Sequence, residues 1–241
     1  MKNTYSSDVF YTQFAQTYAQ YAFGKKDYIT AVNRFICKES ISPSNILDVG
    51  SGDGKRAKTI ADAIGVKNIT LVDNSEGMVL LSKKITDATV IYADITRRDF
   101  DFKKKYDLVL CLWNVFGHIA TENERIIAMK NLGNLLSDGG VLFIDVNNRY
   151  NSTHYGKFSV FRNLLKDLFL SKDKTGNFDL SFKADTGNIT TKVHIFNPKE
   201  IEYLIKSAGL TVEKRIILNY KTGTVEENFW KGQLVYKIIK K

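Results

Sequence analysis

Three glycines at alternate positions follow an early apolar run of the chain. Residues 46–49 (Ile-Leu-Asp-Val) lead directly into Gly50, Gly52 and Gly54. Glycine adopts positive φ readily and, because it has no Cβ, lets the backbone approach a ligand closely. Open α/β sheets bind their ligands at the carboxyl ends of the strands. The spacing therefore predicts a cofactor site at this turn, with a purely structural strand-to-helix turn as the alternative.

A carboxylate in the next apolar run narrows the choice of cofactor. Asp73 ends that run about 20 residues further on, a separation that places a carboxylate where it can accept hydrogen bonds from ribose hydroxyls. Lys55 stands where a dinucleotide fingerprint needs its last glycine, and the chain has no Gly-Lys-Ser/Thr phosphate loop. These residues favour an adenosine cofactor without a pyrophosphate over NAD or ATP.

Further motifs follow in a set order along the chain. They are DVGSGDG at 48–54, VDNSEGM at 72–78, YADI at 92–95, YDLVLCLWNVFGH at 106–118, and two later blocks at 136–145 and 195–210. In order and spacing they resemble the class I, Rossmann-like S-adenosylmethionine-dependent methyltransferases of the small-molecule type, from Tyr11 to the last strand. The resemblance implies S-adenosylmethionine as the cofactor and S-adenosylhomocysteine as the product.

The resemblance also implies a set of cofactor-binding residues. In that family the glycine turn contacts the methionine part of the cofactor, and the segment after the fourth strand closes the pocket beside the sulfonium. The residues so implied are Tyr18, Asp48, Gly50, Ser51, Gly52, Asp73, Asn74, Met78, Ala93, Asp94, Ile95, Leu112 and Trp113. Among them, Asp48 is expected to orient the methionine part. Met78 is expected to lie against the adenine and Asp94 to accept from its amino group.

His118 is the candidate for contact with the methyl acceptor or for removal of its proton, because it follows the fourth strand at the ligand-bearing edge. The alternative is a helix-start histidine bonded to backbone. Methyl transfer is an in-line displacement that depends mainly on orientation, and it needs a base only where the acceptor must lose a proton. As a base, His118 is expected to titrate near the ordinary imidazole pKa of about 6.5.

Other polar and aromatic residues are candidates for acceptor binding. They are Tyr11, Asp145, Asn147 and Tyr150. Tyr11 belongs to an aromatic amino-terminal segment that resembles the lid of many small-molecule methyltransferases, with core packing as the alternative. The other three follow the fifth strand, where ordinary loop starts are also polar. His154 and His194 are expected to be structural, since their spacing gives no metal pair.

Hydrophobic periodicity supplies the elements that must position these residues. Apolar runs predict strands at 45–49, 68–73, 89–93, 106–112 and 141–146, and the helical segments between them cover 55–64, 76–84 and 123–136. Ser75, Thr121 and Asn197 are the expected helix caps, and residues 137–140 are expected to break the chain before the fifth strand. A helix from Asn197 to Gly209 precedes two β-rich stretches, 210–220 and 229–239.

This alternation predicts an α/β fold with a parallel sheet covered on both faces. With the family resemblance, the expectation is a seven-stranded, mostly parallel sheet whose last hairpin is antiparallel. We expect one domain over residues 1–241. Its parts are a helical lid (1–44), the cofactor-binding core (45–148), a substrate-cap insertion after the fifth strand (149–195), and the last helix with the terminal hairpin (196–241). The insertion is expected to hold an amphipathic run at 160–170 and two strands around residues 185–188.

Composition limits the partners. The chain has 241 residues and a net charge of +9, of which residues 149–241 hold 17 basic against 9 acidic groups. The two cysteines, Cys37 and Cys111, are too far apart in sequence to suggest a disulfide framework or a metal cluster, so no metal is expected. No apolar run reaches the roughly 18 residues of a membrane span. A cytoplasmic location without a membrane partner is therefore expected.

The predicted activity is methylation of an oxygen or nitrogen of a small metabolite or short peptide. The two segments that flank the core, 1–44 and 149–195, can roof a closed pocket for such an acceptor. Two alternatives remain open. One is an RNA or protein methyltransferase that uses the basic carboxyl-terminal part, although nucleic acid is the less favoured partner. The other is a non-catalytic protein that binds the cofactor, because a fold alone does not imply a function.

Overall fold

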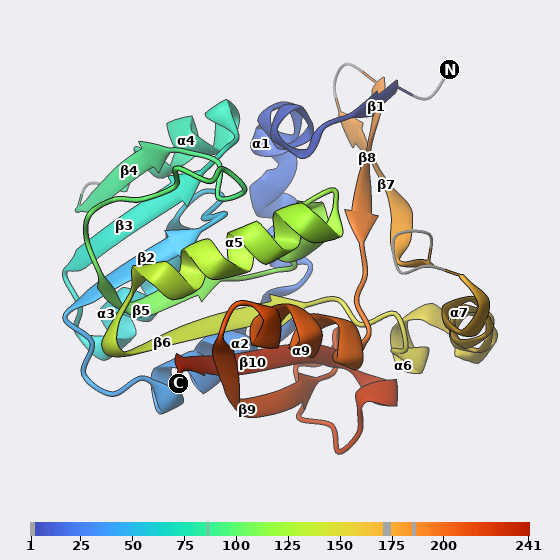
Figure 1. The fold of residues 1–241 in the computed structure, drawn as a ribbon. Coiled ribbons are helices and arrows are strands. Elements are labelled where there is room, and N and C mark those ends of the chain that lie inside the picture. Colours follow the sequence, from blue (N-terminus) through green and yellow to red (C-terminus); the bar gives the residue numbers. More distant parts are fainter. Residues whose placement is uncertain (1–2, 86, 171–174, 185–186) are drawn as a thin grey trace.

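A seven-stranded sheet forms the centre of the structure, which is a computed structural model that describes residues 3–85, 87–170, 175–184 and 187–241 (Figure 1). The strand order is β4-β3-β2-β5-β6-β10-β9. The strands are β2 (Asn45–Val49), β3 (Asn68–Asp73), β4 (Ala88–Tyr92), β5 (Tyr106–Cys111), β6 (Leu136–Val146), β9 (Leu210–Leu218) and β10 (Gln233–Lys240). Strand β10 pairs antiparallel with β6 and β9, and the other pairs are parallel. The predicted fold class is confirmed.

Helices cover both faces of this sheet. On one face α2 (Lys26–Glu39) and α3 (Lys55–Ile64) pack over Ile46, Leu108 and Leu110. On the other face α5 (Glu122–Leu135) and α9 (Pro198–Ser207) pack over Leu47 and Val109. Successive side chains of a strand point to opposite faces, so a strand buried on both sides must be apolar throughout. This explains the uninterrupted apolar runs of the sequence.

The expected helix caps are confirmed. Ser75 accepts from the Met78 amide at the start of α4 (Glu76–Ser82), and Asn197 accepts from the Glu200 amide at the start of α9. Thr121 forms a capping box with Glu124 at the start of α5. Each cap satisfies amides that the helix itself leaves without an acceptor. The sequence therefore predicts the residues at which helices α4, α5 and α9 begin.

Two expected boundaries are wrong. Residues 137–140 do not form a loop between α5 and the next strand. They belong to β6, which begins at Leu136 and pairs with β5 in an irregular register. Residues 229–231 form the short helix η2 (Phe229–Lys231) in place of the start of a strand. Its carbonyl groups accept from side chains of residues 148–153. These tertiary contacts replace strand pairing until β10 begins at Gln233.

Residues 3–23 and the strand pair of the insertion pack together beside the main sheet, whereas the rest of the amino-terminal segment, with α2, packs on the sheet itself. Helix α1 (Ser7–Phe23) follows the short strand β1 (Asn3–Tyr5), which pairs in parallel with β8 (Gly187–His194), and β8 pairs with β7 (Asn177–Ala184). Residues 185–186 of the expected hairpin lie outside the described residues. Phe14 stacks on Phe182, with ring centroids 4.5 Å apart. The chain therefore holds the lid and the insertion together by a small sheet and an aromatic contact.

The described part of the insertion also contains helices α6 (Ser152–Tyr155) and α7 (Lys157–Phe169), which follow β6 after residues 147–151. Figure 1 shows α7 at the edge of the molecule. The expected amphipathic run at 160–170 thus belongs to a helix that starts three residues earlier. Within the described part of the chain, no helix has both the length and the apolar character to cross a membrane.

Candidate active site

The glycine turn after β2 adopts a conformation that other residues rarely take. Gly50 and Gly52 have φ values of +71° and +57°. A Cβ on Gly50 would lie 2.4 Å from a methyl group of Val115, and one on Gly52 would lie 2.8 Å from the Tyr18 hydroxyl. Both distances are too short for carbon contacts, so both positions need glycine for backbone conformation and for space.

Asp73 joins this turn to the next strand. Its carboxylate accepts from the Gly52 amide at 2.9 Å and from the Ser75 amide at 2.9 Å. Burial raises the pKa of Asp73 to about 6, although these backbone amides oppose the shift. The carboxylate therefore changes its ionisation close to neutral pH. It lies where β3, the glycine turn and the start of α4 meet.

A cavity of about 460 Å³ lies over these strand ends. Many of the residues predicted to bind the cofactor line it, namely Tyr18, Gly50, Gly52, Asp73, Asn74, Met78, Ala93, Asp94, Ile95, Leu112 and Trp113. Further wall comes from β1, the lid, the insertion, the short helix η1 (Val115–His118) and the start of α5. It includes Tyr5, Tyr11, His118, Asn177, Thr191 and His194. The lid and the insertion thus complete a chamber that the sheet alone would leave open.

Two predicted cofactor residues, Asp48 and Ser51, are not among the described residues that line this cavity. Both are buried at the glycine turn. Among the described residues, neither Asp48 Oδ1 nor Ser51 Oγ has a hydrogen-bond partner. Burial raises the pKa of Asp48 to about 7, although Arg56 opposes the shift. A buried carboxyl oxygen without a donor beside an open glycine cradle fits a ligand that brings positive charge, as the methionine part of S-adenosylmethionine does.

Trp113 enters the cavity from a strained turn after β5. Trp113 and Asn114 have φ values of +62° and +61°, a conformation that costs residues other than glycine about 1–3 kcal/mol each. Asp145 holds the turn, because its carboxylate accepts from the Trp113 amide at 2.6 Å and its carbonyl accepts from the Asn114 amide at 3.0 Å. The Asn147 amide donates to the Asn114 side chain at 2.9 Å.

Asp145 and Asn147, which the sequence suggests as acceptor contacts, therefore support the turn that carries Trp113. Neither is among the described lining residues of the cavity. Tyr21 of α1 stacks on the Trp113 ring with centroids 5.4 Å apart, and Tyr18 meets it edge-on at 5.7 Å. The indole is thus held by the two lid tyrosines, and its Nε1 donates to the Tyr220 hydroxyl at 3.3 Å.

His118 and Tyr11 meet in the same chamber. The Tyr11 hydroxyl lies 2.9 Å from His118 Nε2, and His118 Nδ1 is buried without a hydrogen-bond partner among the described residues. Burial lowers the pKa of His118 to about 4. The expected titration near 6.5 is therefore wrong for this histidine. Its ring is neutral across the physiological range, because the dry surroundings disfavour the imidazolium form.

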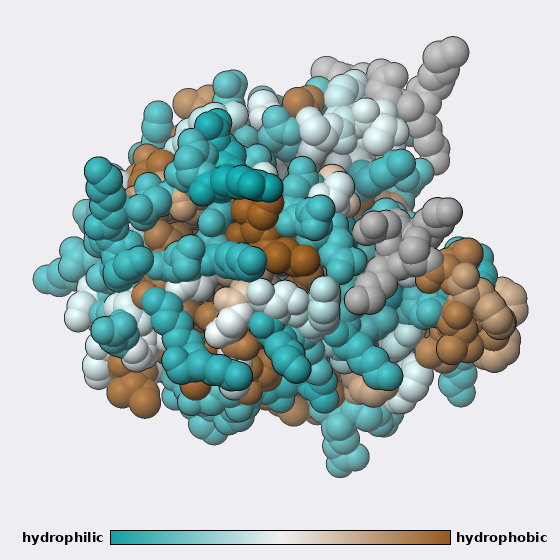
Figure 2. Space-filling view, in the orientation of Figure 1, coloured by the Kyte–Doolittle hydropathy of each residue, from teal (hydrophilic) through white to brown (hydrophobic). Residues whose placement is uncertain are grey.

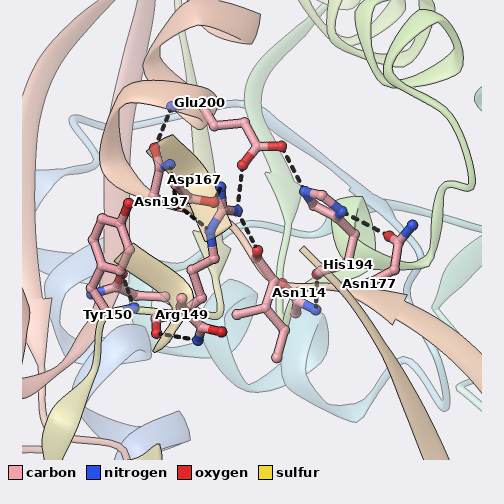
Figure 3. A network of polar contacts seen from close by, with 11 residues as sticks. Asn114, Arg149, Tyr150, Asp167, Asn177, His194, Asn197 and Glu200 are labelled. Atoms are coloured by element: carbon pink, nitrogen blue, oxygen red, sulfur yellow. Dashed lines mark hydrogen bonds and ion pairs between the residues drawn. The ribbon is translucent and has the colours of Figure 1, made fainter. Parts of the chain in front are cut away.

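Tyr150 belongs to a polar network that connects the insertion to α9 (Figure 3). Its hydroxyl donates to Asp167, which also receives two hydrogen bonds from Arg149. Arg149 then donates to Glu200 at 2.6 Å. Tyr150 is not among the described residues that line the cavity. Its contacts instead fix α7 against the rest of the protein.

The same network reaches the cavity through His194. Its two ring nitrogens lie 2.9 Å from the Asn177 side chain and 2.6 Å from Glu200 (Figure 3). His194 is buried and also lines the cavity, and both of its ring nitrogens are engaged by these partners, so its structural role stays a prediction. Burial lowers its pKa, although Glu200 opposes the shift. Arg149, Asp167 and Glu200 come from distant segments, and no local sequence signal marks them as partners.

Comparison with known proteins identifies the family. The sequence matches the family described as "Methyltransferase domain" over residues 18–215. The chain belongs to this methyltransferase family. The predicted methyltransferase is confirmed. Solved structures described as S-adenosylmethionine-dependent methyltransferases, or as complexes with that cofactor, share its fold at 16% and 11% identity. Among the described residues, no group of three or more His, Cys, Asp or Glu side chains could hold a metal ion.

Proteins similar to this methyltransferase include enzymes with named substrates and an uncharacterized protein. It is 24% identical over 234 residues to an uncharacterized protein of Methanocaldococcus jannaschii, covering 95% of this chain and 83% of that protein. It is 26% identical over 107 residues to the dTDP-3-amino-3,6-dideoxy-alpha-D-glucopyranose N,N-dimethyltransferase of Streptomyces fradiae, covering 44% of this chain and 40% of that protein. The structure of the CcbJ methyltransferase from Streptomyces caelestis aligns with a TM-score of 0.72 at 16% identity, covering 98% and 99% of the two chains.

Proposed function

We propose that this methyltransferase methylates an amine nitrogen of a small metabolite or short peptide. The observation that carries the proposal is the cavity of about 460 Å³, walled by the lid and the insertion as well as by the strand ends. Its volume is in the range of about 300–1,000 Å³ that is typical of small-molecule pockets. Nitrogen is preferred over oxygen because the matched Streptomyces fradiae enzyme is, by its name, an N,N-dimethyltransferase of an amino sugar.

The residues at the strand ends fit the cofactor by their chemistry. S-adenosylmethionine, when bound, supplies an electrophilic methyl group on a positively charged sulfur. We assign the ribose hydroxyls to Asp73 and the methionine part to the glycine turn above Asp48, which offers an unpaired carboxyl oxygen. Trp113, held between Tyr18 and Tyr21, presents aromatic surface beside the site, and such rings attract cations.

His118 is proposed to orient the acceptor. In the tautomer with its proton on Nε2, the ring donates to the Tyr11 hydroxyl and leaves the Nδ1 lone pair available to accept from an amine N–H. A pKa of about 4 makes His118 a weak proton acceptor, so hydrogen bonding suits it better than proton removal. Holding an amine in near-attack geometry can supply much of the rate of a displacement.

The acceptor class is tested with a panel of substrates. We expect S-adenosylhomocysteine to form with amino sugars or with peptides that have a free amino terminus, and to be absent when that amine is acetylated. Hydroxyl acceptors without an amine serve as the comparison, and turnover only on these would contradict the nitrogen assignment. Tight tRNA binding whose affinity falls steeply with salt would instead favour the polymer alternative, because counterion release governs such binding.

The role of His118 is tested by two substitutions in single-turnover measurements. His118→Ala removes the hydrogen-bond acceptor and is expected to slow transfer by about 5- to 150-fold, the range that corresponds to one buried hydrogen bond. His118→Asn keeps an amide oxygen that can accept, so it is expected to retain most of the rate. Affinity for S-adenosylhomocysteine should stay the same in both. Equal rates for His118→Ala and the parent would remove His118 from the reaction, and equal losses in both variants would indicate proton removal.

A further inference from the structure

Helix α7 exposes an unusually apolar face. Figure 2 shows hydrophobic residues gathered over this helix at the edge of the molecule. The exposed apolar side chains are Phe158 (79% exposed), Phe161 (58%), Leu165 (43%), Leu168 (76%), Phe169 (82%) and Leu170 (47%). The first four recur at intervals of three and four residues, so they form one stripe along the helix. A contiguous apolar patch of this kind marks an interaction site more often than scattered exposed residues do.

The inner face of α7 combines the buried Val160 with two polar contacts, and these fix the orientation of the helix. Asp167 is held by two hydrogen bonds from Arg149, and the Asn163 side chain donates to the Arg149 carbonyl at 3.2 Å. Both partners of Arg149 point away from the exposed stripe, since Asn163 is buried and Asp167 is partly buried. The apolar stripe is therefore held outward by buried ionic contacts.

The charges on the outer part of α7 all have the same sign. Lys157, Arg162 and Lys166 are exposed. At 100° per residue, Lys157 falls on one border of the apolar stripe and the other two fall on the opposite border. The acidic residue of the helix, Asp167, is engaged by Arg149. Long basic side chains at the borders of an apolar helical face are typical of helices that lie in the headgroup region of a membrane.

We propose that α7 docks the methyltransferase on an anionic phospholipid surface. The apolar stripe would enter the boundary of the acyl chains while the three cations meet lipid phosphates. A second copy of the chain fits less well, because a two-fold contact places the same patch on both subunits and would bring cations against cations. This mode differs from membrane spanning, which the sequence and the described helices both argue against. It does not depend on the identity of the methyl acceptor.

Vesicle co-sedimentation of the full chain tests the proposal. The parent is expected to bind phosphatidylcholine vesicles that contain phosphatidylglycerol, to bind pure phosphatidylcholine more weakly, and to be released by salt. Phe158→Ser with Leu168→Ser, and separately Arg162→Glu with Lys166→Glu, should each lower the partition coefficient at least about tenfold. The matched control is Ile41→Ser with Val225→Ser, which changes two residues of 87% and 72% exposure far along the chain from α7.

Each possible outcome decides the matter. Unchanged circular dichroism in the variants, together with loss of vesicle binding in both α7 pairs alone, supports the proposal. Failure of the parent to bind anionic vesicles overturns it, as does equal binding by the Phe158/Leu168 variant or equal loss in the control. A parent dimer in light scattering that the Phe158/Leu168 variant converts to a monomer would also overturn it, because a second copy would then cover the stripe.

Discussion

Asp73 occupies the point where ligand binding and proton binding are coupled. Its pKa is raised to about 6 by burial, against a reference value of 3.8. A carboxylate accepts hydrogen bonds from two hydroxyls, whereas the protonated acid has fewer acceptor sites to offer. The contribution of Asp73 to the affinity for S-adenosylhomocysteine is therefore expected to be constant above pH 7 and to fall by up to about tenfold per pH unit below pH 6.

Calorimetry across this pH range gives the measurement, and substitution gives the control. Asp73→Ala should weaken binding by about 1–3 kcal/mol at pH 7.5 and should reduce the pH dependence between about pH 5 and 7, leaving the part that Asp48 causes. Asp62→Asn, a change at an exposed carboxylate of α3, should leave both unchanged. A pH dependence that is not reduced in Asp73→Ala would assign the whole titration to another group, with Asp48 the first to examine.

At the scale of elements, the turn after β5 depends on the end of β6. The Asp145 carboxylate accepts from Trp113 and, at 2.8 Å, from the buried Tyr28 hydroxyl, and Arg56 lies 3.6 Å away. Asp145→Ala would leave all three groups without this acceptor. The expected loss is about 3–5 kcal/mol of unfolding free energy, which denaturant titration can measure.

A second measurement separates positioning from general destabilisation. Asp145→Asn keeps an oxygen for one donor, so it should lose less stability while it still relaxes the Trp113 turn. Weaker cofactor binding and a red-shifted tryptophan emission are expected in a folded Asp145→Asn protein. Asp138→Ala, at an exposed position of the same strand, should change stability by less than about 0.5 kcal/mol. Unaltered emission and affinity in Asp145→Asn would show that the turn is self-supporting.

The sequence predicts elements whose signals are local. The strand before Gly50, the cap at Ser75 and the Thr121 capping box all depend on a few adjacent residues, and the structure has each of them. Strand β1 was missed because it is three residues long and its partner in β8 lies 186 positions away. The contacts of Tyr150 could not be predicted for a similar reason, since Asp167 and Arg149 meet only after α7 has docked.

The low pKa of His118 also depends on the whole fold. Because His118 shortly follows the strand at 106–111 (β5), the sequence predicts that it faces the cavity, and His118 does line the cavity. The degree of burial depends on α1 folding back over η1, which places Tyr11 against the ring. A local reading assigns an ordinary imidazole pKa to this residue, whereas the assembled lid removes the water that would stabilise its charged form.

At the scale of the whole molecule, a residue assigned to cofactor binding lowers the stability of the free protein. Asp48 is buried, and its pKa rises from 3.8 to about 7 on folding. Between these values the folded state binds more protons than the unfolded state, so the contribution of Asp48 to stability falls as pH rises from about 4 to 7. The loss is on the order of 4 kcal/mol. A group this unfavourable in the free protein is typical of functional sites, where ligand binding compensates.

Replacing Asp48 by Asn tests this conflict directly. Asn cannot ionise, so the unfolding free energy of Asp48→Asn should match that of the parent at or below about pH 4 and exceed it by a few kcal/mol at pH 8. The same variant should bind S-adenosylhomocysteine more weakly at pH 8, because the ionised carboxylate that faces the glycine turn is lost. Urea titrations at several pH values and calorimetry at pH 8 give the two quantities. A stability difference that does not change with pH would mean that Asp48 is ionised with little penalty in the free protein. A gain in unfolding free energy at pH 8 without any loss of affinity for S-adenosylhomocysteine would remove Asp48 from the cofactor site.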